Sequence, residues 1–182
     1  MEKIDVEHKE EILERIRQAG DPDNYVTSWN DKGVPKSKKK MDVVRGKTSR
    51  AKGSQFELKV RRDLESKERF VDKWNNNVDL EKGEIVPAKR KYNPFNKAMV
   101  IGTGFPDFIS IKHVHNGLYS VIGVEVKVNG LLSKEEKEKC AFYLQKGVFS
   151  DIWIARAVQN GRKMEIKYDD FREKYGDKYN KP

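Results

Sequence analysis

Two carboxylates and a lysine are the residues of this 182-residue chain whose types and spacing best suit chemistry. Asp107 follows a turn-like run at residues 104–106, and Glu125 comes eighteen residues later, two positions before Lys127. Both segments are β-branched or aromatic runs bounded by turn residues, a pattern that predicts strands. Because side chains alternate along a strand, Glu125 and Lys127 share one face, and the valines beside them share the other.

The second of these strands is apolar and is followed by helical sequence, so we expect it to be buried on both faces. A buried charge without compensation costs several kcal/mol even after the protein relaxes. A divalent metal ion held by Asp107 and Glu125, with Lys127 directed at a phosphate, would supply that compensation. A structural salt bridge between Glu125 and Lys127 is the alternative interpretation.

The segments around these residues predict a mixed α/β fold. A helix at residues 54–66 carries Phe56, Val60 and Leu64 on one stripe, and a second helix begins at Ser133. Strands are expected in the segments that carry Asp107 and Glu125 and near residues 70–74, 84–88, 151–158 and 164–168. A helix, a central mixed sheet, a helix and a further strand form an αβββαβ core with helices flanking the sheet.

The order and spacing of these residues resemble those of a known group of enzymes. The Pro-Asp motif at Asp107, followed by Glu125-x-Lys127, resembles the PD-(D/E)XK nuclease superfamily. Residues 50–57 resemble the opening helix of its archaeal Holliday junction resolvases, and the resemblance covers roughly residues 50–157. It implies a restriction-endonuclease-like fold and a homodimer.

Two glutamates have both a functional and a structural interpretation. The resemblance implies that Glu57 reaches the metal site directly or through water, but residues 54–57 also form a capping box at a helix start. Ser133 and Glu136 form a second capping box, at a place where relatives often carry a glutamine that touches the site. We include Glu57 among the catalytic residues and expect Glu136 to act as a cap alone.

We therefore expect a divalent-metal-dependent DNA endonuclease that hydrolyses phosphodiester bonds and recognises DNA structure or backbone. Asp107, Glu125 and the carbonyl of Val126 would hold Mg²⁺ among hard oxygen ligands, with Mn²⁺ as a substitute. Lys127 would position the attacking water or stabilise the transition state. Two alternatives stay open: a catalytically inactive DNA-binding accessory protein of the same fold, and an RNA-directed nuclease.

A second Glu-x-Lys pair, Glu165 and Lys167, lies in another strand-like run with Asp151 upstream. We prefer the set that contains Asp107, because its glycine and proline approach lets a backbone come close to a ligand. Its strands are also more apolar, and predicted helices lie before and after it.

Three other motifs are interpreted as structural. His113 and His115 precede a hairpin signal at residues 116–117 and are expected to be exposed at a strand end. Residues 102–104 lack the later glycine and the lysine of a phosphate-binding loop. Cys140 lies among apolar residues of a predicted helix and is expected to be a small core side chain.

Composition favours a polyanionic partner, because the chain carries a formal net charge of +9. Its single cysteine excludes an intramolecular disulfide. The N-terminus is too charged for a signal peptide, and no run approaches the length of a membrane span. These features predict a soluble, cytoplasmic protein that binds DNA and no membrane.

Positive charge is concentrated ahead of the predicted nuclease domain. Residues 1–49 are expected to form a helix, at residues 4–19, and a basic arm, whereas residues 50–182 form the nuclease domain. A dense run of like charge is commonly a flexible nucleic-acid-binding arm, with a solvated linker as the alternative. The basic and aromatic loop at residues 89–95 suits phosphate contact and base stacking, unless it is a plain surface loop. The expected nucleic-acid-binding residues are Lys36, Lys38, Lys39, Lys40, Arg45, Lys47, Arg50, Lys52, Lys89, Arg90 and Lys91.

Overall fold

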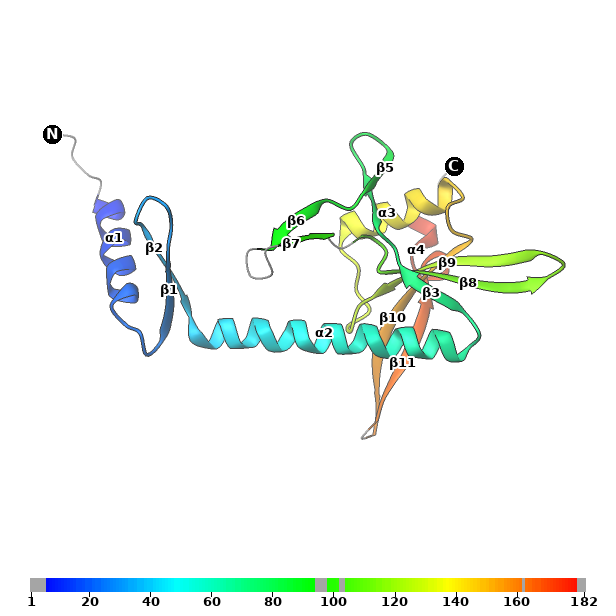
Figure 1. Cartoon of the computed structure of the whole chain (residues 1–182), viewed down its shortest axis with the longest axis horizontal. Helices are drawn as coiled ribbons and strands as arrows, with labels where there is room; N and C mark the ends of the chain where they lie inside the picture. The colour runs from blue at the N-terminus through cyan, green and yellow to red at the C-terminus, as the bar shows by residue number, and fades with distance from the viewer. Residues whose placement is uncertain (1–5, 94–97, 102–103, 162, 180–182) are drawn as a thin grey trace. The chain divides into compact units, whose positions relative to one another are not determined.

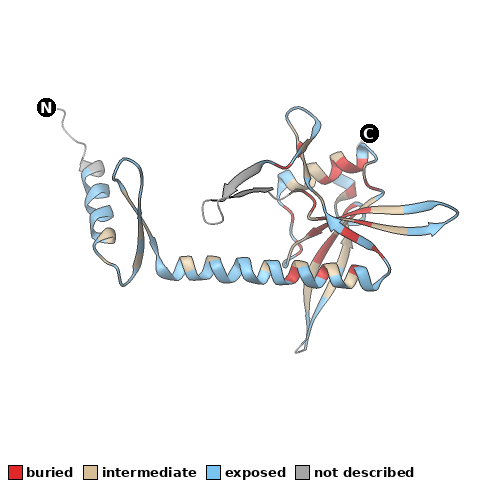
Figure 2. Ribbon diagram, in the orientation of Figure 1, coloured by how far each residue is buried: buried red, intermediate tan, exposed pale blue. Residues whose placement is uncertain are grey.

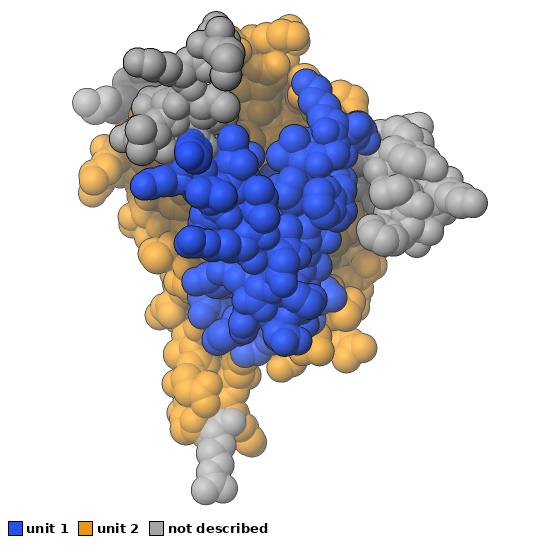
Figure 3. Space-filling model, turned by 90° about the vertical axis from the view of Figure 1, so that its left-hand side faces the viewer, with its two compact units in different colours: residues 1–52 blue, residues 53–182 orange. Residues whose placement is uncertain are grey.

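The computed structural model describes residues 6–93, 98–101, 104–161 and 163–179. The chain divides into two compact units, coloured separately in Figure 3. Unit 1 comprises Met1–Lys52 and unit 2 comprises Gly53–Pro182. The boundary between them falls within the long helix α2, Lys40–Ser66.

Unit 1 consists of a helix, a β-hairpin and the first part of α2. Helix α1, Val6–Ala19, packs on both strands of the hairpin, β1 (Tyr25–Trp29) and β2 (Pro35–Lys39). The strands are antiparallel, with Val26 opposite Lys38. The end of α1 at Ala19 agrees with the glycine and proline that follow it in the sequence.

The basic segment of unit 1 differs from the predicted flexible arm. Strand β2 and the first three turns of α2 occupy it, so α2 begins at Lys40 and not at Ser54. Lysine and arginine are good helix formers, and Asp42 in the first turn interacts favourably with the helix dipole. The capping box predicted at residues 54–57 is therefore wrong, because Ser54 lies inside the helix. No helix within the described ranges is both long and apolar enough to cross a membrane.

Unit 2 is built on a five-stranded mixed sheet in the order β11-β10-β9-β8-β3 (Figure 1). Neighbouring strands are antiparallel except β9 and β10, which are parallel and are connected by helix α3, Lys134–Gln145. Helix α4, Phe171–Tyr179, follows the last strand. The strands of this sheet are β3 (Phe70–Lys73), β8 (Phe108–His115), β9 (Leu118–Val126), β10 (Asp151–Asn160) and β11 (Lys163–Asp170).

Two further hairpins lie between β3 and β8 in the sequence. The first pairs β4 (Asn76–Asp79) with β5 (Glu84–Pro87), and the second pairs β6 (Arg90–Asn93) with β7 (Ala98–Ile101). The strand predicted near residues 84–88 therefore exists but lies outside the main sheet. Gly83, in the turn with φ of +66°, lets it fold back on β4 instead of β3.

The sheet is covered on both faces, which gives unit 2 three layers (Figure 2). On one face, the predicted stripe of α2 packs against the sheet in a buried cluster: Phe56, Val60, Leu64, Val71, Phe108, Ile122, Val124 and Ala155. On the other face, α3 and α4 contribute to a second cluster, which includes Tyr143, Leu144, Phe171, Ile152 and Ile154. The expected burial of the second site strand on both faces is confirmed, because Val124 and Glu125 are both buried.

The turn between β8 and β9, together with a one-residue register shift between His113 and His115, sets the register of the strands that lead to the candidate site. Asn116 and Gly117 have φ of +46° and +76°, as a two-residue hairpin turn requires. His113 and His115 are exposed beside this turn, as predicted. Phe108 pairs with Val124, so the residue before Phe108 lies across from the residue after Val124.

Candidate active site

Asp107 and Glu125 meet where β8 begins and β9 ends. The N–H of Asp107 donates to Oε2 of Glu125 at 3.2 Å, and the N–H of Val126 donates to Oδ2 of Asp107 at 3.0 Å. Glu125 is only 4% exposed. Each carboxylate is therefore held by the backbone of the opposite strand, and the pairing predicted from their spacing is present.

The approach to Asp107 depends on close backbone packing. A side chain at Gly104 would collide with the carbonyl oxygen of Trp74, so only glycine fits there. Across the strands, a Cβ on Gly123 would lie 2.8 Å from Cγ of Pro106. The glycine and proline ahead of Asp107 thus hold its backbone against β9 and against the segment that begins the β4–β5 hairpin.

Lys127 lies directly after β9 and is held by two carboxylates. Its Nζ lies 3.0 Å from Oε1 of Glu125 and 2.6 Å from Oε1 of Glu136. The other oxygen of Glu136 accepts the N–H of Ser133 at 2.7 Å, and Oγ of Ser133 accepts the N–H of Glu136 at 3.2 Å. The expectation that Glu136 acts as a cap alone is wrong, because it caps α3 and also binds the site lysine.

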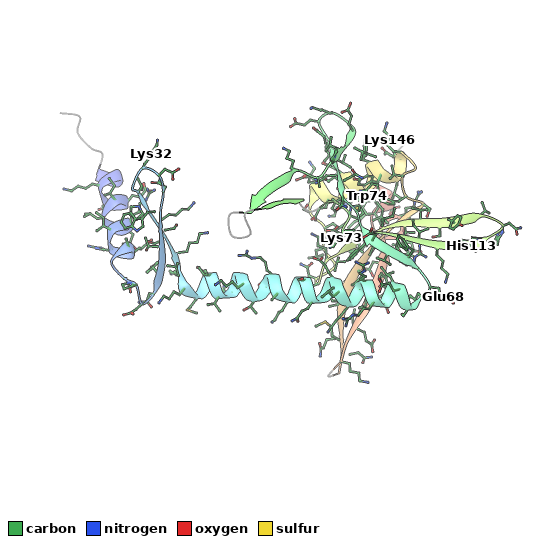
Figure 4. The ribbon with its side chains drawn as sticks, viewed as in Figure 1. Lys32, Glu68, Lys73, Trp74, His113 and Lys146 are labelled. Carbon is green, nitrogen blue, oxygen red and sulfur yellow. The ribbon has the colours of Figure 1, made fainter. Side chains whose placement is uncertain are left out.

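Glu57 faces the site from α2, but its carboxylate is paired with another lysine. Nζ of Lys73, on β3, lies 2.6 Å from Oε2 of Glu57 and 4.4 Å from the ring centre of Phe108. Lys73 is labelled in Figure 4. Sequence reasoning missed this residue because no motif marks it: it reaches the site only because β3 pairs with β8, with Lys73 opposite Phe108.

The candidate site residues other than Lys73 line one pocket of about 370 Å³ in unit 2. Its walls come from α2, the first inserted hairpin, the strand ends and the first turns of α3. The lining residues are Glu57, Asn77, Gly104, Phe105, Asp107, Glu125, Val126, Lys127, Ser133, Glu135, Glu136 and Lys139. All four of the predicted catalytic residues therefore face the same space.

Burial and mutual repulsion hold the two central carboxylates in an unusual state. Burial raises the pKa of Asp107, and the negative charge of Glu57 raises it as well, although the N–H of Val126 acts in the opposite direction. Burial, followed by the charge of Asp107, raises the pKa of Glu125 to about 8. A bound cation would relieve this repulsion.

The lysine of the site stays charged for a different reason. Burial alone would lower the pKa of Lys127, but its ion pairs with Glu136 and Glu125 outweigh this effect and raise that pKa. The same contact with Lys127 lowers the pKa of Glu136 in spite of burial. Lys127 is therefore a fixed positive charge at the edge of the carboxylate pair.

The donor set suits a hard cation with an incomplete protein shell. Across the described ranges, no three side chains of His, Cys, Asp or Glu are grouped closely enough to enclose a metal ion. Magnesium is usually bound through one or two carboxylates, with water and substrate phosphates in the other positions. Asp107 and Glu125 provide two such carboxylates, so the residues present fit Mg²⁺ and do not form a closed structural metal site.

The alternative set of Asp151, Glu165 and Lys167 is not brought together in the structure. Glu165 lies on the edge strand β11, opposite Val158, and accepts a hydrogen bond from the side chain of Asn160 at 2.8 Å. Glu165 and Lys167 are both exposed, whereas Asp151 lies at the opposite end of β10. Cys140 is fully buried, as expected of a core residue.

The predicted nucleic-acid-binding residues are exposed where the structure describes them. In unit 1 these are Lys36, Lys38, Lys39, Lys40, Arg45, Lys47, Arg50 and Lys52, and in unit 2 Lys89. Within the described part of the chain, none of them forms an ion pair. The side chains of Arg90 and Lys91, and the loop that follows them, lie outside the described residues.

We compared the chain with known proteins at three levels. No protein-family model, no curated protein and no solved structure matches it. The function of the site is therefore inferred from its own geometry and chemistry.

Proposed function

We propose that this protein is a divalent-metal-dependent DNA endonuclease of the PD-(D/E)XK type. The observation that carries the proposal is the convergence of Asp107, Glu125 and Lys127 in one pocket at the end of two adjacent strands. Two carboxylates with raised pKa values, the buried Glu125 and the half-buried Asp107, beside a fixed lysine are typical of a site that acts on a charged substrate.

The proposed metal ligands are Asp107, Glu125 and the carbonyl of Val126. The N–H of Val126 points at Asp107, and in a regular strand the carbonyl of a residue lies on the same side as its N–H. When bound, Mg²⁺ would lower the pKa of a water and neutralise charge on the scissile phosphate. The second strand thus offers a side-chain oxygen and a main-chain oxygen to one ion.

Lys127 is the proposed stabiliser of the transition state. Its charge is oriented before substrate arrives, because Nζ of Lys127 lies 2.6 Å from Oε1 of Glu136 in the first turn of α3. Preorganised charge of this kind is usually the largest contribution to catalysis. Glu57 lines the same pocket, and its ion pair with Lys73 places a second cation near the substrate position.

The arrangement of unit 2 supports the restriction-endonuclease-like interpretation. The elements of its main sheet follow one another as α2, β3, β8, β9, α3 and β10, the αβββαβ order expected for that core. The site lies on the second and third of these strands. The exposed lysines of unit 1 suit a DNA backbone, and the homodimer implied by the resemblance stays a prediction.

The experiment that tests this proposal is a cleavage panel with the full chain. Labelled single-stranded, duplex, flapped, splayed and four-way DNA, with matching RNA, are incubated with Mg²⁺, Mn²⁺ or EDTA. We expect at least one DNA to be cut with Mg²⁺ and none with EDTA. Binding without cleavage under every condition would favour the inactive accessory protein, and cleavage of RNA alone would favour the RNA-directed nuclease.

A further inference from the structure

Unit 1 contains a pocket of about 750 Å³ that shares no residue with the candidate active site. Three elements form its walls. Gln18 comes from the last turn of α1, Tyr25 and Ser37 come from the hairpin, and the first three turns of α2 form the third wall. This volume lies within the range of 300–1,000 Å³ that is common for pockets that hold small ligands.

The charge of this pocket favours a phosphate-bearing ligand. Lys38, Lys39 and Arg50 line it, and Asp42 is its one acidic lining residue. None of the three cations is paired with a carboxylate elsewhere in the described ranges. Nε of Arg50 donates to the carbonyl of Gly46 at 3.3 Å, which holds the guanidinium along the pocket face of α2.

The pocket also has an aromatic wall and a floor without a side chain. Tyr25 is half-buried and lies opposite Lys39 in the hairpin. Gly46 is also a lining residue, and a Cβ built on it would meet only a terminal nitrogen of Arg50, at 3.9 Å. Aromatic rings stack on any unpaired base, and neighbouring cations contact its phosphates. Tyr25, the open floor at Gly46 and the cations therefore match the parts of one nucleotide.

We propose that this pocket binds a nucleotide of single-stranded nucleic acid, with its base against Tyr25 and its phosphates beside Lys38, Lys39 and Arg50. The inference rests on the nucleic-acid-binding part of the proposed function and narrows the substrate to one with an unpaired strand. A paired base is stacked inside the duplex and cannot enter such a pocket without being extruded. Duplex DNA would contact exposed lysines of unit 1 through its phosphates, without inserting a base into the pocket.

The sharpest test fills the pocket without changing its charge. In Gly46→Leu the new side chain would occupy the floor, and leucine also favours a helix more than glycine does. Gly53→Leu is the matched control, because Gly53 lies in the same helix, does not line the pocket and has open space around it. Fluorescence anisotropy of the full chain in EDTA measures binding to a labelled 15-mer of thymidine and to a mixed-sequence duplex.

We expect Gly46→Leu to bind the single strand about tenfold more weakly, in the range for loss of one base-stacking contact. Its duplex affinity should change by less than about twofold, because the phosphate contacts of exposed lysines dominate there and the variant leaves these lysines in place. Gly53→Leu should bind both probes like the wild type. Unchanged single-strand binding by Gly46→Leu, or an equal loss on both probes, overturns the inference.

A charge comparison provides the second test. The first variant replaces three lining residues, Lys38, Lys39 and Arg50, with Gln. The control replaces Lys32, Lys36 and Lys47 with Gln and so removes the same charge outside the pocket. The first variant should weaken single-strand binding more than the control does. Equal losses would overturn the inference. Both tests are made without metal, so absence of cleavage by the wild type would reject the proposed function and leave the pocket result standing.

Discussion

Unit 1 and unit 2 hold their charged side chains in different environments. In unit 2, Glu125 is 4% exposed, and Lys127 is fixed between Glu125 and Glu136. In unit 1, no side chain is buried in the range 9–52, and the lysines of β2 are exposed. Burial raises the pKa values of the site carboxylates in unit 2, and ion pairs hold Lys127 in a fixed position.

Under the proposed function, we interpret this difference as a division of labour between binding and chemistry. Exposed lysines and arginines release counterions when they contact phosphates, which provides affinity without sequence information. The carboxylate pair of Asp107 and Glu125 provides little affinity for a polyanion, because its negative charge repels phosphates. It can, however, hold a cation where a phosphodiester is to be cut. Variants that change one unit and leave the other intact can therefore separate binding from chemistry.

The largest expected effect comes from neutralising the carboxylates of unit 2. Asp107→Asn and Glu125→Gln keep the shape of the site and remove its charge. Loss of one preorganised catalytic group typically costs about 10²–10³ in rate, so we expect at least this loss of cleavage in single-turnover assays. DNA affinity, which we propose to depend on unit 1, should stay the same or rise slightly.

Glu165→Gln is the matched control for these variants. It removes a glutamate from a second Glu-x-Lys pair that is exposed on β11. It should cut DNA at the wild-type rate. Normal cleavage by Asp107→Asn or Glu125→Gln would refute the site assignment.

The second prediction concerns the pH dependence of unfolding. The pKa of Glu125 is raised from 4.5 to about 8 in the folded chain, so the folded state holds this proton more tightly than the unfolded state. The resulting stability is complete below pH 4.5 and is lost as the pH rises to about 8, by at most about 1.4 kcal/mol per pH unit. Glu125→Gln should remove this loss.

Urea unfolding in EDTA at pH 5, 6.5 and 8 measures the effect. The free energy of unfolding of the wild type should fall relative to Glu125→Gln as the pH rises, while Glu165→Gln should follow the wild type. Added Mg²⁺ should stabilise the wild type more at pH 8 than at pH 5, because the cation competes with protons for the carboxylates. Parallel pH profiles for wild type and Glu125→Gln would show that Glu125 has an ordinary pKa.

The third prediction concerns the lysines of unit 1. Each phosphate contact contributes about −0.9 to the slope of log affinity against log salt on duplex DNA. Replacing Lys36, Lys38, Lys39 and Lys40 with alanine should therefore flatten the slope by about 3 and leave the position of cleavage unchanged. The control replaces four exposed lysines of unit 2 with alanine: Lys82, Lys134, Lys163 and Lys178. An unchanged slope in the first variant would move the DNA surface out of unit 1.

The central pair of the site could be predicted because its geometry is local. A two-residue turn at residues 116–117 begins the pairing of β8 and β9, and a register shift of one residue between His113 and His115 then places Asp107 across from Glu125. The eighteen-residue spacing predicts the two neighbouring strands, whereas the one-residue shift that aligns the two carboxylates has no mark in that spacing. The apolar stripe of Phe56, Val60 and Leu64 predicts the face of α2 that packs on the sheet.

The features that the sequence did not reveal depend on a balance between opposing local effects or on contacts between residues far apart in the sequence. The extension of α2 back to Lys40 depends on helix propensity outweighing repulsion among like charges, and the pattern alone does not decide between them. The pairing of Glu57 with Lys73 requires β3 to lie beside β8. The second role of Glu136 requires the start of α3 to lie against the end of β9, which is set by the crossover to β10.

The smallest expected effect separates the two roles of Glu136. Ser133→Ala removes the cap hydrogen bond of α3 and should lower the free energy of unfolding by about 1 kcal/mol. It leaves the ion pair with Lys127 in place, so kcat should stay unchanged.

Glu136→Gln can still accept the N–H of Ser133, but it replaces a charged partner of Lys127 with a neutral one. Its stability should change little, and kcat should fall by no more than about tenfold, because a charge-assisted hydrogen bond is roughly twice as strong as a neutral one. Thermal unfolding and single-turnover cleavage of both variants give the comparison. If Ser133→Ala reduces kcat as much as Glu136→Gln does, the position of α3 matters to the site and the contact between Glu136 and Lys127 does not.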